Sequence, residues 1–376
     1  MSADHSTIRG VIDESTATGY RQSLKDYVQA NPSVRGYPPE KKQFFEIYWS
    51  ESQLRARSHP NVVATAAWLN TLFHASESSA VSLSSTLVYA DRFRMREPGV
   101  LWTLHSPHID GGSIEKWEDP ILRKCFDTIL AGDWGKYDPF DFTHRLEGNT
   151  DMYNRPNQSS VFRTWQGWLA MSYHPVLPRP HSLTAYIILR PFFKPVDGDS
   201  NNLDSSNWTI DVAGSPDFHG LRRELNSFGK EMFTSLRASQ ESHPHLRVDQ
   251  TMTSAPRVTQ VTWSSGIVIC FIRLKPSTRV PGLLGDVHPS RPLNLAECQI
   301  AAQRDAFLAG KPPPDFPQHD GQGESGYVNK GREEHITSPE GRCAMGLKPF
   351  DTSAPSLTAS EKDVLAKANS IFGLAT

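Results

Sequence analysis

Apolar side chains near the start of the chain recur at helical spacing. The stretch from Lys41 to Arg57 carries aromatic and aliphatic residues about one helical turn apart, which predicts a helix. A second helix is expected to begin at Pro60, because proline suits the first turn, where its missing N–H would have no intrahelical partner. Residues 1–18 are polar and rich in serine and threonine, so we expect a disordered tail there.

The hydrophobic pattern changes beyond Ser84 to short runs rich in β-branched and aromatic residues, which predict strands. One helix interrupts them at Glu118–Leu130, where acidic residues and Pro120 mark the start and an apolar face follows. The chain becomes helical again toward its C-terminus. The predicted strands are Thr86–Asp91, Val100–Leu104, Ser160–Met171, Leu183–Phe193 and Trp208–Val212, and the later helices are Ala296–Leu308 and Ser360–Phe372.

The clearest chemical motif is His108-Ile109-Asp110, which is followed by two glycines. Alternate residues of an extended segment point to one side, so His108 and Asp110 can reach one ion while Ile109 points the other way. An imidazole and a carboxylate are two of the three protein ligands that hold non-heme Fe(II) in oxygenases. The motif indicates a metal site at a strand end. A surface turn with Asp110-Gly111 at its corner is the alternative.

The order of the predicted elements indicates the fold class. Many strands, few intervening helices and a metal-type motif at a strand end predict a mainly β fold with flanking helices (α+β). The specific expectation is a double-stranded β-helix, the jelly roll of cupin-like proteins, whose mouth would carry the site. We expect one jelly-roll domain over residues 19–350, with a helical part over 19–80, and a C-terminal tail with a helix over 351–376.

Composition narrows the range of partners. The 376 residues carry a net charge of −2 with both signs interspersed, which gives no indication of a nucleic-acid or anionic-membrane partner. The 4 cysteines form no Cys-x-x-Cys pair, which argues against structural zinc and against a disulfide framework. No signal-like segment appears, and no run approaches the roughly 20 apolar residues that span a bilayer. We expect a cytoplasmic protein with a small-molecule substrate, in an oligomeric state that the sequence leaves open.

Several blocks along the chain follow one another in the order of a known family. They are Tyr89–Arg96, Ser106–Asp119, Phe162–Leu169, Thr184–Phe193, Gln303–Pro317 and Gly341–Leu347. On these blocks the chain resembles domain-of-unknown-function family 1479, of the clavaminate-synthase-like superfamily. The resemblance implies a jelly-roll fold, Fe(II) bound by His108 and Asp110, and 2-oxoglutarate as co-substrate.

The third iron ligand is missing where the resemblance places it. The family has a Gly-Asp turn, a Trp-His-Cys-Asp segment and a distal histidine there, whereas Thr259–Lys275 contains no histidine. The other histidines fit loops or the core better than a metal site. The arginine that would bind the 2-oxoglutarate carboxylate also stays unassigned. The histidines considered are His105, His219, His243, His245 and His288, and the arginines are Arg92, Arg94, Arg163 and Arg279.

A shifted reading frame accounts for the missing histidine. Back-translation of Thr259–Lys275, read from the third base of each codon, admits Pro-Gly-Asp-Leu-Val-Val-Trp-His-Cys-Asp-Leu-Phe-His-Gln-Val-Glu. The distal histidine is then encoded across the codons of Phe271 and Ile272. We therefore interpret residues 260–275 as a misread frame, with a strand of badly matched faces or poor order expected there. Genuine divergence of a dispensable loop is the alternative.

The leading hypothesis is a non-heme Fe(II), 2-oxoglutarate-dependent oxygenase that hydroxylates a small organic substrate. With two protein ligands, His108 and Asp110, the chain is expected to bind iron poorly and to turn over 2-oxoglutarate slowly. A non-catalytic β scaffold and a metal-dependent hydrolase are the alternatives. Metal analysis separates the oxygenase from the scaffold, and succinate formation separates it from the hydrolase.

Overall fold

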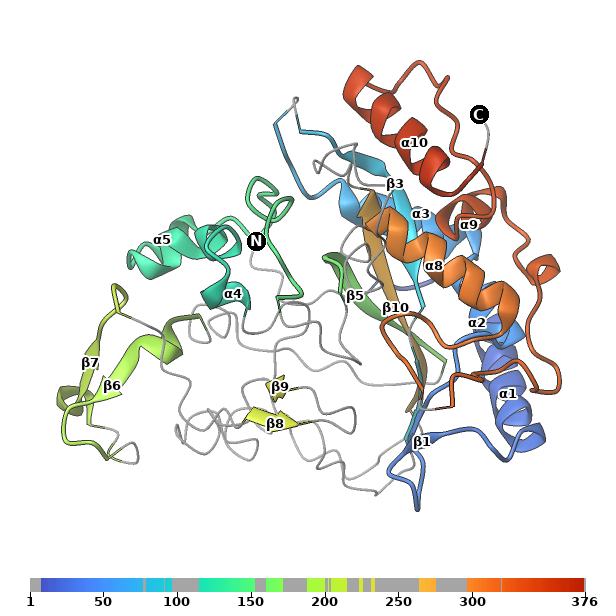
Figure 1. The fold of residues 1–376 in the computed structure, drawn as a ribbon, viewed down its shortest axis with the longest axis horizontal. Helices are drawn as coiled ribbons and strands as arrows, with labels where there is room; N and C mark the ends of the chain where they lie inside the picture. The colour runs from blue at the N-terminus through green and yellow to red at the C-terminus, as the bar shows by residue number, and fades with distance from the viewer. Residues whose placement is uncertain are drawn as a thin grey trace. The chain divides into compact units, whose positions relative to one another are not determined.

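The computed structural model describes a defined set of residues. They are 8–76, 79–90, 92–96, 115–152, 160–171, 188–199, 202, 204–214, 223–225, 231–233, 264–274, 296–318 and 320–374. The chain divides into two compact units. The first unit comprises Met1–Ile8, Val100–Arg155 and Pro175–Val261, and the second comprises Arg9–Gly99, Pro156–His174 and Thr262–Thr376 (Figure 1).

Three helices open the second unit. Helix α1 (Glu14–Ala30) begins after Asp13, whose carboxylate accepts the Thr16 N–H, so residues 14–18 of the predicted tail are helical. Helix α2 (Glu51–Arg57) follows a capping box formed by Ser50 and Gln53. Helix α3 (Pro60–Asn70) has proline in its first turn, which confirms the predicted start.

The helix predicted over Lys41–Arg57 was wrong in its first half. Phe44–Phe45 form strand β2, which pairs with β1 (Gly36–Tyr37) and with β4 (Phe93–Arg96). The aromatic pair is placed by these partners, which lie elsewhere in the sequence. The helix begins only at Glu51, where the capping box satisfies the first backbone N–H groups.

One six-stranded antiparallel sheet forms the centre of the second unit. Its order is β1-β2-β4-β10-β3, and β5 also pairs with β10; the remaining strands are β3 (Ser82–Tyr89), β5 (Arg163–Ala170) and β10 (Ser264–Leu274). Gly266 of β10 opposes both β4 and β5, and Cys270 opposes both β3 and β5. Strands β3 and β4 therefore share one edge of β10, and β5 takes the other. The described strands close no barrel, so the jelly roll stays a prediction.

Helices from the C-terminal part pack beside this sheet. Helix α8 (Ala296–Ala309) and helix α10 (Ala359–Ile371) lie against β3 and β10, and both confirm the predicted helices (Figure 1). A short helical turn, η7 (Glu333–His335), and helix α9 (Pro339–Ala344) lie between them in the chain. The main core joins side chains from helices and strands of the second unit, among them Leu24, Trp49, Leu87, Phe93, Ile300, Phe307 and Val364.

The first unit is built from short elements around a smaller core. Where one helix was predicted over Glu118–Leu130, a four-residue helix ends at Glu118 and two short helical turns follow, because Pro120 lacks an N–H and the Asp119 carboxylate accepts the N–H groups of Ile121 and Leu122. The small core contains Trp117, Phe126, Ile129, Ile188 and Phe192. The elements are α4 (Glu115–Glu118), η1 (Leu122–Phe126), α5 (Asp127–Leu130), η2 (Trp134–Lys136), η3 (Arg190–Phe192), β6 (Phe193–Pro195), η4 (Ser205–Asn207), β7 (Trp208–Ile210), β8 (Arg223–Leu225) and β9 (Glu231–Phe233).

The length and hydropathy of the helices bear on membrane insertion. Within the described part of the chain, no helix is both long enough and apolar enough to cross a bilayer.

Candidate functional site

The predicted iron ligands His108 and Asp110 lie outside the described residues. The same holds for the weaker candidates His105, His219, His243, His245, His288 and Arg279. In the part of the chain that the structure describes, no group of three or more His, Cys, Asp or Glu side chains is placed to hold a metal ion. The iron site therefore stays a prediction from the sequence.

The last residues of the block Ser106–Asp119, from Glu115 onward, belong to the described part of the chain, and two of them are buried. Trp117 is buried, and its indole N–H donates to the Ile188 carbonyl oxygen at 2.9 Å. Glu115, which opens α4, is also buried. The chain that follows His108 and Asp110 is thus tied into the small core of the first unit.

Three arginines from the blocks that resemble the family lie against aromatic rings in the second unit. The Arg92 guanidinium carbon is 4.3 Å from the centre of the Phe44 ring and 4.4 Å from that of Phe316. The Arg94 guanidinium carbon lies 4.8 Å from the Phe44 ring centre, because these two residues are register partners in β4 and β2. The third arginine, Arg163, lies 5.5 Å from the ring centre of a tyrosine in β3, Tyr89.

A buried carboxylate, Asp315, interacts with the charge of one of these arginines, Arg163. It accepts hydrogen bonds from the Tyr89 hydroxyl at 2.5 Å, the Ser160 N–H at 2.9 Å and the Ser160 hydroxyl at 2.7 Å. Burial raises the pKa of Asp315, and the three hydrogen bonds and the charge of Arg163 act in the opposite direction. Asp315 therefore joins the end of β3, the segment before β5 and the proline-rich segment of the C-terminal part.

This cluster of Arg92, Arg94, Arg163 and Asp315 has a limited range of chemistry. Arginine stays protonated at all physiological pH values, so the three arginines supply positive charge and N–H donors, whereas Asp315 supplies a buried carboxyl group. A guanidinium that stacks its faces on rings keeps its donors in the plane, where they match a carboxylate. The arrangement suits the binding or orientation of an anion.

The sequence identified Arg92, Arg94 and Arg163 as candidates but did not predict the aromatic rings that they contact. Phe44 lay in the span predicted as helix, and Phe316 lay in the block Gln303–Pro317, which was used only for the family resemblance. In the sequence, these rings were indicated only by the Asp315-Phe316 pair, within the block that ends at Pro317. Which side chains meet there depends on the strand pairing of β2 with β4.

Comparison with known proteins identifies the family. A family model described as Gig2-like matches residues 5–347. This chain belongs to the Gig2-like family. A curated relative, the uncharacterized protein YbiU of Escherichia coli (strain K12), is 30% identical over 213 residues, which cover 51% of this chain and 50% of that protein. The match thus spans about half of the curated relative's length.

Solved structures of similar proteins agree with the family assignment. GlcNAc Inducible Gene 2, GIG2 (DUF1479), from Candida albicans shares the fold, with a TM-score of 0.71 and 24% identity over 97% of this chain and 78% of that one. The "Putative Oxidoreductase" from Salmonella typhimurium LT2 has a TM-score of 0.58 and 20% identity over 90% of this chain and 79% of that one. The resemblance to domain-of-unknown-function family 1479 is confirmed.

Proposed function

We propose that this member of the Gig2-like family is an oxidoreductase that uses Fe(II) and 2-oxoglutarate to hydroxylate a small organic substrate. The observation that carries the proposal is the His108-Ile109-Asp110 motif, with an imidazole and a carboxylate at the spacing that reaches one ion from an extended segment. A structural neighbour described as a "Putative Oxidoreductase" supports the reaction class.

The donor set fits two of the three positions that such a site needs. His108 and Asp110 would hold the metal, and their nitrogen and oxygen donors suit Fe(II). When bound, the iron and its co-substrate supply the oxidising chemistry that protein side chains lack. The protein would orient the substrate and exclude water. The guanidinium groups of Arg92 and Arg94, stacked on aromatic rings, fit a reactant that carries a carboxylate.

A second candidate, a non-catalytic β scaffold, is favoured by the sequence of strand β10. The family resemblance places the distal histidine in this stretch, and Ser264–Leu274 contains none. The strand nevertheless occupies a central position in the sheet. A chain of this sequence can therefore keep its fold while it lacks one iron ligand.

Iron content and succinate release test the proposal on the purified full chain. Loaded with Fe(II) in the absence of oxygen, the wild-type chain is expected to bind iron weakly, because one ligand is missing. Once oxygen is admitted, it is expected to release succinate slowly from 2-oxoglutarate. The Asp110→Ala variant is expected to lose the iron while it keeps its circular dichroism spectrum. Asp133→Ala, at an exposed surface position, is the matched control and should bind iron as the wild type does.

Three outcomes would contradict parts of this interpretation. Equal iron content in Asp110→Ala and the wild type would remove Asp110 from the site. Iron binding without succinate, together with hydrolysis of a test ester, would favour the hydrolase. Rapid succinate release by the wild type would show that another residue supplies the third ligand.

A further inference from the structure

Two tyrosines of the second unit donate their hydroxyls to carboxylates inside the protein. Tyr89 donates to Asp315 at 2.5 Å, and Tyr27 donates to Glu324 at 2.7 Å. All four side chains are buried. The tyrosines come from different elements, β3 and α1, so the same arrangement of phenol and carboxylate occurs at two places in the chain.

Both carboxyl groups are surrounded by further donors. Glu324 also accepts the backbone N–H groups of Tyr48 and Trp49, at 2.6 Å and 3.0 Å. Asp315 also accepts the N–H and the hydroxyl of Ser160. Burial raises the pKa of each carboxyl group, whereas these donors and the charge of a nearby arginine act in the opposite direction. Oxygens that accept from several donors suit a carboxylate ion, which is able to take up a proton.

Aromatic rings lead from one pair to the other and on toward the surface. The ring centre of Tyr89 lies 5.9 Å from that of Phe316, and the Phe316 ring stacks on Tyr48 at 5.5 Å. The backbone of Tyr48 contacts the carboxylate to which Tyr27 also donates. The ring centre of Tyr27 lies 6.1 Å from that of Tyr327, which is partly exposed. We name the series Tyr89, Phe316, Tyr48, Tyr27 and Tyr327 the tyrosine route.

We propose that the tyrosine route carries oxidising equivalents between the interior of the second unit and its surface, with Tyr89 and Tyr27 as redox-active residues. Tyr89 gives one electron to a one-electron oxidant, which is thereby reduced, and the phenolic proton moves along its hydrogen bond to Asp315. Tyr27 then reduces the Tyr89 radical, which takes its proton back, while the proton of Tyr27 passes to Glu324.

The charges of the buried pairs favour this coupled transfer. An oxidised phenol that kept its proton would be a cation in the interior, where an unpaired charge is costly. When the proton moves to the carboxylate instead, the pair loses one negative charge and gains no positive one. The inference rests on the proposed function only for the natural source of the oxidant, since iron cofactors supply one-electron and oxygen chemistry. The route would discharge an oxidant that no substrate has consumed.

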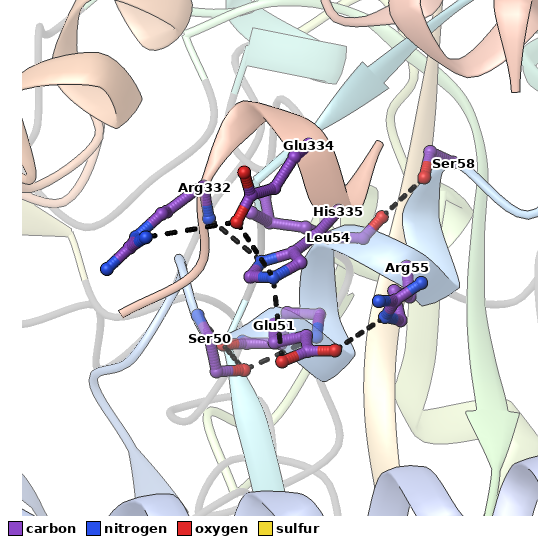
Figure 2. A network of polar contacts seen from close by, with 9 residues as sticks. Ser50, Glu51, Leu54, Arg55, Ser58, Arg332, Glu334 and His335 are labelled. Carbon is purple, nitrogen blue, oxygen red and sulfur yellow. Dashed lines mark hydrogen bonds and ion pairs between the residues drawn. The ribbon is translucent and has the colours of Figure 1, made fainter. Parts of the chain in front are cut away.

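Exposure distinguishes these pairs from a carboxylate at the surface. Figure 2 shows Glu51, which accepts from Arg55 at 2.7 Å and lies 3.7 Å from His335. The side chains of Arg55 and Glu51 are 40% and 44% exposed, so water reaches this carboxylate. Glu51 is thus a carboxylate of the same unit that lies outside the tyrosine route, and Glu51→Gln is the matched control.

Flash photolysis followed by EPR spectroscopy tests the route on the metal-free full chain at pH 8. A ruthenium tris-bipyridine complex with persulfate supplies the one-electron oxidant, and ring-deuterated tyrosine identifies radicals on tyrosine. The wild type is expected to hold a tyrosyl radical that outlasts the flash, because the buried rings are shielded from reductants in solution. The radical oxygen should show a coupling to an exchangeable proton, the one received by the carboxylate.

Variants separate the redox role from a structural one. The double variant Tyr27→Phe with Tyr89→Phe keeps the rings and is expected to lose the long-lived radical. Asparagine accepts the hydrogen bond of a phenol but does not take up its proton, so Asp315→Asn should lose the same part of the signal as Tyr89→Phe. Glu51→Gln should lose none of it.

Four results would overturn the tyrosine route. They are the absence of a long-lived tyrosyl radical in the wild type, a radical without the exchangeable proton, a full signal in the double variant, and an equal loss in Glu51→Gln and Asp315→Asn. The two measurements on the wild type decide the matter even if the variants fold poorly. Failure of the iron proposal alone would leave every signal unchanged, because the oxidant is supplied from outside.

Discussion

Two buried carboxylates join distant segments of the second unit, each through donors from elsewhere in the chain. Asp315 accepts from Tyr89 and Ser160. Glu324 accepts from the Tyr27 hydroxyl at 2.7 Å and from the backbone N–H of Tyr48 at 2.6 Å. A buried carboxylate needs such donors, because an unpaired charge in the interior costs several kcal/mol, by rough estimate. These contacts hold the C-terminal segment against the N-terminal one.

The effect of Asp315 on stability is expected to depend on pH. Because burial raises its pKa, the folded protein holds this proton more tightly than the unfolded chain does. The contribution to the free energy of unfolding is therefore fully present below the ordinary aspartate pKa of about 3.9 and is lost as the pH rises through the raised value. The asparagine of Asp315→Asn does not titrate, so the pH-dependent loss of unfolding free energy should be absent in this variant.

Urea unfolding of the wild type and Asp315→Asn between pH 4 and pH 7 checks this expectation. The variant should be less stable at the acid end by about 1–3 kcal/mol, because its amide NH₂ faces a donor. The difference should shrink as the pH rises. Asp133→Asn, on the surface, is the control, and parallel curves for Asp315→Asn and the wild type would contradict the prediction.

At the scale of elements, close approach of helix α9 to the end of α2 requires a glycine. A Cβ on Gly341 would lie 2.4 Å from the Ser58 Cβ and 2.7 Å from the Ser58 Cα. Gly341 also donates its N–H to the Ser338 hydroxyl at 2.9 Å, which begins the helix. Helix α9 can therefore lie this close to Ser58 only because Gly341 has no side chain.

Gly341→Ala is expected to destabilise the protein by about 1–3 kcal/mol, as overpacking of a filled interior does. This cost exceeds the gain of roughly 1 kcal/mol that alanine brings to a helix. Gly326→Ala is the matched control, since nothing lies within 4 Å of its added Cβ, and it should change stability by less than about 0.5 kcal/mol. Thermal unfolding of both variants measures the difference. An unchanged melting temperature for Gly341→Ala would contradict the packing argument.

At the scale of the whole molecule, strand β10 links the sheet. Its residues pair with β3, β4 and β5, in an antiparallel register along most of its length. Residues 260–275 are also the segment interpreted as a misread frame. Ladder hydrogen bonds come from the backbone, so many sequences can form such a strand. The pairing is therefore compatible with a segment whose side chains were not selected for this place.

Exchange of residues 260–275 for the shifted-frame peptide is expected to restore the site. The peptide supplies the distal histidine, so iron content should rise toward one ion per chain and succinate release should increase. The control combines the exchange with Asp110→Ala. This double change should show no increase in iron content or in succinate release. Sequencing of the transcript gives an independent result. A message that encodes residues 260–275 as printed, or an exchange without added iron, would contradict the frame interpretation.

Local chemistry in the chain was sufficient to predict several elements of this protein and the family to which it belongs. Pro60, the apolar spacing over Ala296–Leu308 and the motif blocks act through neighbouring residues, and neighbours are visible in the sequence. The strand at Phe44, the rings around Arg92 and the partners of Asp315 were decided only by the tertiary structure. Each depends on segments far apart in the chain, and no local pattern specifies which of them will meet.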